Sequence, residues 1–137
     1  MWQLYALLSA IFAALTSIFA KIGMNDMNSN LGTALRTVVV LGMSWMVVFV
    51  TGAQSGFGNL TRTNYIFIIL SGLATGVSWL FYFYALRLGD VSRVAPIDKL
   101  SIVFTLIFAF IFLGEAINLK TVVGILLITA GTLLLIK

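Results

Sequence analysis

The chain has 137 residues, of which 61% are hydrophobic and only 9% are charged, and its net charge is +4. A soluble domain is typically about 45–50% apolar and about 25% charged, so this composition excludes a water-soluble domain and indicates an integral membrane protein. The chain has no cysteine and no histidine, which excludes disulfides, thiolate chemistry, zinc sites and imidazole catalysis.

Five long apolar runs follow one another along the chain, each near the roughly 20 residues that a membrane helix needs. They predict an all-α membrane protein with five transmembrane helices at about 2–22, 31–51, 65–88, 92–113 and 119–136, in a single domain over 1–137. A transmembrane barrel would show alternating segments of about ten residues, which these runs are not. No basic residue precedes the first run, so we interpret it as a retained span rather than a signal peptide.

The fourth run carries Pro96, Asp98 and Lys99. Ionisable groups at membrane depth cost about 2.5–3.5 kcal/mol each on insertion scales, so they are rare and usually functional. Neighbours in sequence point about 100° apart on a helix, so Asp98 and Lys99 are predicted not to pair well. Arg36 is the predicted partner of Asp98. Lys99 is expected to meet a substrate, a freed carbonyl or water, or to extend its stem to the interface.

Pro96 leaves two alternatives open. In a first helical turn it is harmless, but in a helix that begins at Ser92 it distorts the segment beside the two charges. Kinked helices near a binding site are typical of secondary transporters, which would make Pro96 a hinge. Asp90 or Ser92 is predicted to cap this helix, and Asn118 to cap the last one.

Polar side chains recur at helical spacing in three runs, and we expect these stripes to face a common cleft. They are Ser71, Thr75, Ser78 and Tyr82; Asp98, Ser101 and Thr105; and, more weakly, Thr33, Arg36 (or Thr37), Val40 and Ser44. For any single hydroxyl, a hydrogen bond within or between helices, worth about 0.6 kcal/mol, is the simpler explanation. Trp79 and Tyr82 either line an aromatic pocket or belong to an interfacial belt. The predicted substrate- or ion-binding residues are Asp98, Lys99, Arg36, Ser101, Thr105, Ser78, Trp79 and Tyr82.

Gly124 and Gly131 lie seven residues apart on one face of the last run, and Gly72 and Gly76 form a GxxxG in the third. Small residues let helix backbones approach closely in lipid. Gly124 and Gly131 therefore predict a homodimer interface, although a tight contact within one chain would use the same residues.

The run from Tyr82 to Ile136 resembles the second half of an EamA domain of the drug/metabolite transporter superfamily, most specifically in PIDKLS and the later FLGE. The opening ALLSAIFAALTSIFAKIG and SNLGTALRTVVV resemble the single-domain bacterial/archaeal transporter branch. The resemblance implies transport of small organic metabolites. Most members carry two five-helix units in inverted orientation, so a chain with one unit is expected to pair, and an antiparallel homodimer would rebuild ten spans.

The small multidrug-resistance proteins of that superfamily are similar in pairing through glycines of their last helix, and they also use a glutamate in the first span. The first run here has no carboxylate, which argues against drug/proton antiport by that mechanism. If transport is coupled to protons, Asp98 is the expected carrier and Glu115 the second candidate. Glu115 is otherwise expected to stabilise the positive end of the last helix.

The distribution of basic residues favours an external N-terminus and a cytoplasmic C-terminus by four to two. Lys21, Arg87, Arg93 and Lys137 lie on one side, and Arg62 and Lys120 on the other. If Arg93 belongs to the helix, the margin falls to three against two, and insertion in both orientations stays open.

The sequence therefore predicts a transporter of the cytoplasmic membrane, with lipid and a small-molecule substrate as partners. The substrate is expected to be anionic or zwitterionic. The dispersed basic residues argue against nucleic acid, and no metal or cofactor is expected. Two alternatives remain: an accessory or structural membrane subunit, and a subunit of a lipid-carrier flippase. An enzyme is not expected, since the sequence shows no nucleophile–base pair or metal-ligand set.

Overall fold

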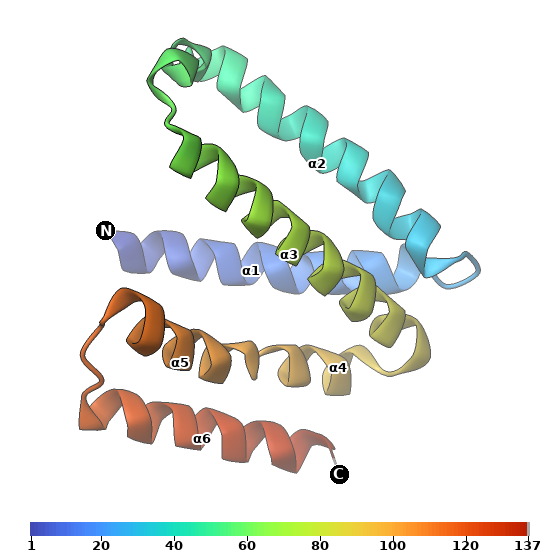
Figure 1. Ribbon diagram of the computed structural model, residues 1–137. Coiled ribbons are helices and arrows are strands. Elements are labelled where there is room, and N and C mark those ends of the chain that lie inside the picture. The colour runs from blue at the N-terminus through green and yellow to red at the C-terminus, as the bar shows by residue number, and fades with distance from the viewer. Residues whose placement is uncertain (137) are drawn as a thin grey trace. The chain divides into compact units, whose positions relative to one another are not determined.

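The computed structural model describes residues 1–136, and no β-strand occurs in that range. The prediction of an all-α protein is confirmed. The helices are α1 (Trp2–Gly23), α2 (Ser29–Thr51), α3 (Arg62–Leu88), α4 (Val91–Asp98), α5 (Ser101–Leu113) and α6 (Leu119–Ile136), with a 3-10 helix η1 (Ala53–Asn59) after α2 (Figure 1).

Five stretches are long and apolar enough to cross a membrane: α1, α2, α3, α6, and Val91–Leu113, which α4 and α5 form together. The prediction of five transmembrane helices is therefore confirmed. The largest shift of a boundary is at α3, which begins at Arg62. There the Thr61 Oγ1 accepts from the Asn64 N–H at 3.3 Å, and the Asn64 Oδ1 accepts from the Thr61 N–H at 3.3 Å. This reciprocal cap extends the helix beyond its apolar run.

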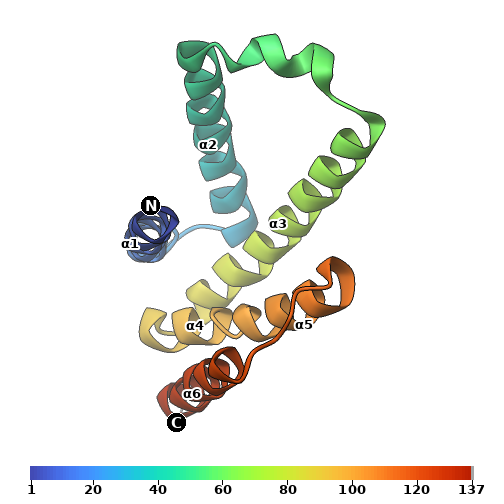
Figure 2. The ribbon, with the colours of Figure 1, turned by 90° about the vertical axis from the view of Figure 1, so that its left-hand side faces the viewer.

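The chain divides into two compact units, and the first is Met1–Arg87. Asn28 caps α2 by accepting from the Asn30 N–H at 2.8 Å, and α2 ends at Gly52, whose φ of 72° suits glycine. Next comes η1, whose Phe57 ring stacks on Trp45 with centroids 6.1 Å apart. Figure 2 shows α2 and α3 diverging toward η1 and approaching each other at their opposite ends.

The second unit begins at Leu88 and contains α4, α5 and α6. The chain reverses after Gly114, whose φ is 64°, so that α6 runs back along α5 and α4 (Figure 1). Asn118 caps α6, as predicted, since its Oδ1 accepts from the Thr121 N–H at 2.8 Å. Asp90 occupies the N-cap position of α4, without a hydrogen bond from its side chain.

The fourth span is discontinuous, and Pro96 lies inside its first segment, α4. Pro96 has no N–H to donate to the Ser92 carbonyl, which weakens the helix at this point. Around the break, the N–H groups of Leu100, Ile102 and Val103 donate to carbonyls three residues back, at 2.9–3.1 Å. This tight 3-10 pattern separates α4 from α5. Of the two alternatives for Pro96, the structure shows the one in which it lies within the helix.

Candidate functional site

Arg36 lies about two turns into α2, in contact with aromatic rings of α3. Its Cζ is 4.5 Å from the ring centroid of Trp79 and 4.4 Å from that of Phe83. A guanidinium within about 6 Å of a ring centroid is attracted by the negative face of the ring. Trp79 and Phe83 are one helical turn apart, so both rings stabilise the same cation. These contacts hold a positive charge inside a membrane span.

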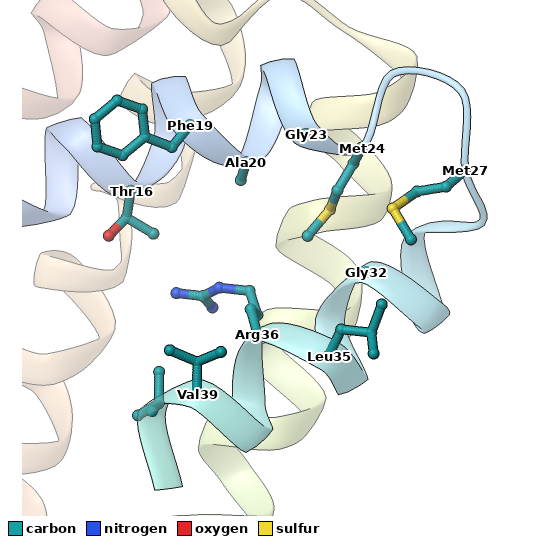
Figure 3. Close-up of a pocket in the computed structure, with 11 residues that line it drawn as sticks. Thr16, Phe19, Ala20, Gly23, Met24, Met27, Gly32, Leu35, Arg36 and Val39 are labelled. Carbon is teal, nitrogen blue, oxygen red and sulfur yellow. The ribbon is translucent and has the colours of Figure 1, made fainter. Parts of the chain in front are cut away.

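The Arg36 Nη1 is buried, and it has no hydrogen-bond partner among residues 1–136. Arg36 also borders a cavity of about 540 Å³ between α1 and α2. Figure 3 shows its guanidinium extending from α2 toward α1, where Thr16 lies. The cavity is lined by Thr16, Phe19, Ala20, Gly23, Met24, Met27, Gly32, Leu35, Arg36, Val39 and Val40. A polar group with unused donors thus borders a mainly apolar cavity.

A neighbouring face of α1 is bound to α3 by two polar contacts. The Ser17 and Tyr82 hydroxyls are 2.6 Å apart, and the Ser17 hydroxyl also donates to the Ala13 carbonyl at 3.0 Å. One turn further, the Lys21 Nζ donates to the Leu86 carbonyl at 2.6 Å. The last carbonyls of a helix lack partners within it, and a lysine is well suited to bind them. Lys21 therefore fixes the end of α3 against α1.

Replacing Lys21 with methionine is expected to lower the free energy of unfolding by about 1–3 kcal/mol, because a buried carbonyl loses a charged donor. Leu86, which supplies that carbonyl, is only 1% exposed. The measurement is thermal unfolding of the purified protein in detergent, followed by circular dichroism. Lys120→Met, at an exposed position near the start of α6, is the matched control. Equal unfolding midpoints for the two variants would contradict the role given to Lys21.

Asp98 and Lys99 lie at the break between α4 and α5, and they contact each other. The Lys99 Nζ is 3.4 Å from the Asp98 Oδ2, and their side chains are 64% and 36% exposed. The prediction that these neighbours do not pair is therefore wrong. It assumed a continuous helix, whereas α4 ends at Asp98 and the long lysine stem reaches back. The break thus carries a paired acid and base within the fourth span.

Most hydroxyls of the predicted stripes bind their own helix. Thr105 donates to the Ser101 carbonyl at 2.9 Å, and Thr75 to the Ser71 carbonyl at 2.9 Å. In α2, Thr37 and Ser44 do the same with the carbonyls of Thr33 and Val40. This is the simpler explanation considered for single hydroxyls. Ser78 is exposed, and binding roles for Ser78, Ser101 and Thr105 stay predictions.

The structure brings together some predicted residues and adds others. In the first unit it places Arg36 beside Trp79, and Tyr82 beside Ser17; in the second it pairs Asp98 with Lys99. The sequence reasoning missed Phe83, Ser17 and Lys21. Each of them lies one helical turn from another residue that makes the same kind of contact. This spacing could have identified them once the other residue was known. The cavity could not be predicted from spacing within one helix, because its lining depends on how α1 packs against α2.

The glycines of α6 make no close contact within the second unit. A Cβ added at Gly124 or Gly131 would meet no atom within 4 Å, and the same holds for Gly72 and Gly76 in α3. Packing inside either unit therefore does not require these glycines. No group of three or more metal-ligating side chains lies together among residues 1–136.

Comparison with known proteins identifies the family. Residues 1–137 match the EamA-like transporter family. The chain is 52% identical over 134 residues to an uncharacterized transporter in the cobO 3' region of a Sinorhizobium species, covering 98% of this chain and 95% of that protein. It is 28% identical over 129 residues to the uncharacterized transporter YxxF of Bacillus subtilis, covering 93% of this chain and 40% of that protein. No solved structure matches the chain. With its five apolar spans, the chain is a multi-pass membrane protein that belongs to the EamA-like transporter family.

Proposed function

We propose that this protein is a secondary transporter that moves a small organic metabolite across the cytoplasmic membrane by alternating access, as a homodimer. The observation that carries the proposal is the discontinuous fourth span, whose break follows Pro96 by about two residues and carries the Asp98–Lys99 pair. Charges are costly inside a membrane and mark substrate or ion pathways there. Broken helices supply such sites in many transporters, where the break also allows one segment to move relative to the next.

Each polar element has a role in this proposal. Asp98 binds a proton or a cationic group, and its contact with Lys99 lets the two charges exchange partners as the substrate arrives. Lys99 and Arg36 bind anionic groups, and Pro96 acts as the hinge. Trp79 and Tyr82, beside Arg36 and Ser17, shape the aromatic side of the Arg36 site. Two bases to one acid favour an anionic or zwitterionic substrate.

Two observations support the homodimer. Within the second unit the glycine face of α6 is open, since no atom of that unit lies within 4 Å of a Cβ added at Gly124 or Gly131. Small residues of this kind allow close helix contact in lipid. The Bacillus relative matches over only 40% of its length, so it is long enough to contain two such units. Pairing two copies of the present chain would supply a comparable number of spans.

Reconstitution of the purified protein into liposomes tests the proposal. The interior is preloaded with buffer, and uptake of labelled carboxylates, organic phosphates and amino acids is measured with and without a proton gradient. We expect protein-dependent accumulation of at least one of these compounds, and a loss of that accumulation in Arg36→Gln. Asp26→Asn, in the exposed turn between α1 and α2, removes a charge without changing the number of basic residues and is the control. If no compound accumulates and the protein instead purifies with a fixed partner chain, an accessory subunit is the better explanation.

A further inference from the structure

The cavity between α1 and α2 has the size and surface of a small-molecule site. Its volume of about 540 Å³ lies within the roughly 300–1,000 Å³ of typical ligand pockets. Along α2 it extends from Gly32 to Val40, a rise of about 12 Å at 1.5 Å per residue. Most of its lining is apolar, including Phe19, Leu35 and Val39. The cavity therefore suits an elongated molecule with a largely apolar body.

Met24 and Met27 form the end of this cavity nearest the turn between α1 and α2, as Figure 3 shows. Atoms of the Met24 side chain lie 2.9–3.1 Å from where a Cβ on Gly32 would be. The absence of a side chain at Gly32 thus lets Met24 lie directly against α2. Methionine side chains are flexible and adapt to irregular shapes. This end of the cavity can therefore accept apolar groups of different outline.

Arg36 is the only charged residue among those that line the cavity. Its guanidinium lies over the rings of Trp79 and Phe83 on α3, and its Nη1 has no hydrogen-bond partner among residues 1–136. A guanidinium has five N–H donors in a planar fork, which matches the two oxygens of a carboxylate. One positive charge balances one negative charge, whereas a second negative charge would be buried unpaired at high cost.

We propose that this cavity binds an amphipathic organic monocarboxylate. The carboxylate pairs with the Arg36 guanidinium, beside the Thr16 hydroxyl, and the apolar body lies between α1 and α2 toward Met24 and Met27. The proposal rests on the proposed transport function, because it names the substrate class of the Arg36 site. It goes further in assigning the selectivity to α1 and α2, and in making the apolar body of the substrate as important as its charge.

Binding of 4-phenylbutyrate to the purified protein in detergent tests the proposal. With Trp2 and Trp45 replaced by phenylalanine, Trp79 is the remaining tryptophan, and its fluorescence reports events at Arg36 directly. We expect a saturable change with 4-phenylbutyrate at a Kd at least about tenfold below that of acetate, a difference of about 1.4 kcal/mol. The amine of the same shape, 4-phenylbutylamine, should cause no saturable change. Equal binding of all three compounds, or stronger binding of the amine, would overturn the proposal.

Variants test separately the charged part of the site, at Arg36, and its apolar part, at Met24. Arg36→Gln should weaken 4-phenylbutyrate binding at least about tenfold, since the charge is lost, while Arg36→Lys keeps the charge and should retain part of the affinity. Gly32→Ala should push Met24 into the cavity, weakening 4-phenylbutyrate but leaving acetate unchanged. Arg62→Gln is the control for the loss of a charge. Should Arg36→Gln fail to fold, as judged by helical content and size-exclusion profile, Gly32→Ala still decides, because unchanged 4-phenylbutyrate binding there contradicts the assignment.

A lipid could also supply an anionic group on an apolar body. The titration is therefore repeated in nanodiscs of phosphatidylcholine with and without phosphatidylglycerol. We expect the same Kd for 4-phenylbutyrate in both. A Kd that rises with the phosphatidylglycerol content would overturn the proposal in favour of a lipid headgroup.

The binding and transport experiments distinguish an error in the substrate class from an error in the transport function. If Arg36→Gln loses transport of some other compound but the wild-type protein does not bind 4-phenylbutyrate, the transport function stands and the substrate class is wrong. If 4-phenylbutyrate binds as expected but no compound is transported, the site stands and the transport function is wrong.

Discussion

Replacing Asp98 with asparagine is expected to reduce transport on the order of 100-fold, equivalent to about 2.8 kcal/mol, without affecting insertion. Asparagine keeps the shape of the side chain, but it can neither carry a proton nor balance the Lys99 ammonium, which lies 3.4 Å away. The measurement is the initial rate of uptake in proteoliposomes, normalised to the amount of folded protein. Asp26→Asn, in the exposed turn between α1 and α2, is the matched control. Uptake that stays at the wild-type rate would remove Asp98 from the mechanism.

The double variant Asp98→Asn with Lys99→Gln separates two roles that the single variant leaves combined. If Asp98 serves only to neutralise Lys99, removing both charges should restore transport. If Asp98 carries a proton or a cationic group, the double variant should stay inactive. The proposed mechanism predicts the second outcome, with uptake by the double variant no higher than by Asp98→Asn.

A reporter fused to either end of the chain is expected to be found on both sides of the native membrane. The distribution of charges gives little preference, because Arg93 lies within α4 rather than in a loop. Three basic residues on the side of the C-terminus then oppose two on the other side, and one of the three, Lys137, lies outside the described residues. When the two sides carry nearly equal numbers of basic residues, the chain can insert in both orientations. An antiparallel homodimer requires such a mixture. A C-terminus confined to the cytoplasm would exclude that dimer and direct attention to a second chain of opposite orientation.

Charge variants make the test of orientation decisive. Removing Arg62 and Lys120 should fix the C-terminus in the cytoplasm, and removing Arg87, Arg93 and Lys137 should place it outside, because Lys21 alone then opposes two basic residues. Each variant alone is expected to lose transport, and co-expression of the two should restore it, because only the mixture can form the antiparallel pair. Full activity of either variant alone would instead support a parallel assembly.

The spans could be predicted from the sequence because membrane helices depend on length and hydropathy, which are local properties. The cap that Asn118 forms on α6 is also a local interaction, since the residue that it binds is three positions away. The early start of α3 was missed because the reciprocal cap of Thr61 and Asn64 lies in a polar stretch that hydropathy treats as loop. Such a cap extends a helix beyond its apolar run.

The sites were harder to predict, for physical reasons that differ between them. The pair joins Asp98, the last residue of α4, to Lys99, which follows it, and Pro96 alone does not fix where α4 ends. The contacts of Arg36 with Trp79 and Phe83 join residues of α2 and α3 that are far apart in the sequence. No periodicity within one helix contains that information. Arg36 could be selected by its charge at membrane depth, but the aromatic surface beneath it could not.

The five spans have a consequence for how longer relatives could arise. An odd number of crossings leaves the start and the end of the unit on opposite sides of the membrane. A second copy joined directly to the end of the first therefore begins on the opposite side and inserts upside down. Gene duplication with a short linker would convert a mixture of two orientations into one chain with a fixed inverted repeat, and each half could then diverge. The loss of one helix, or the gain of one, would make the same duplication yield a parallel repeat instead.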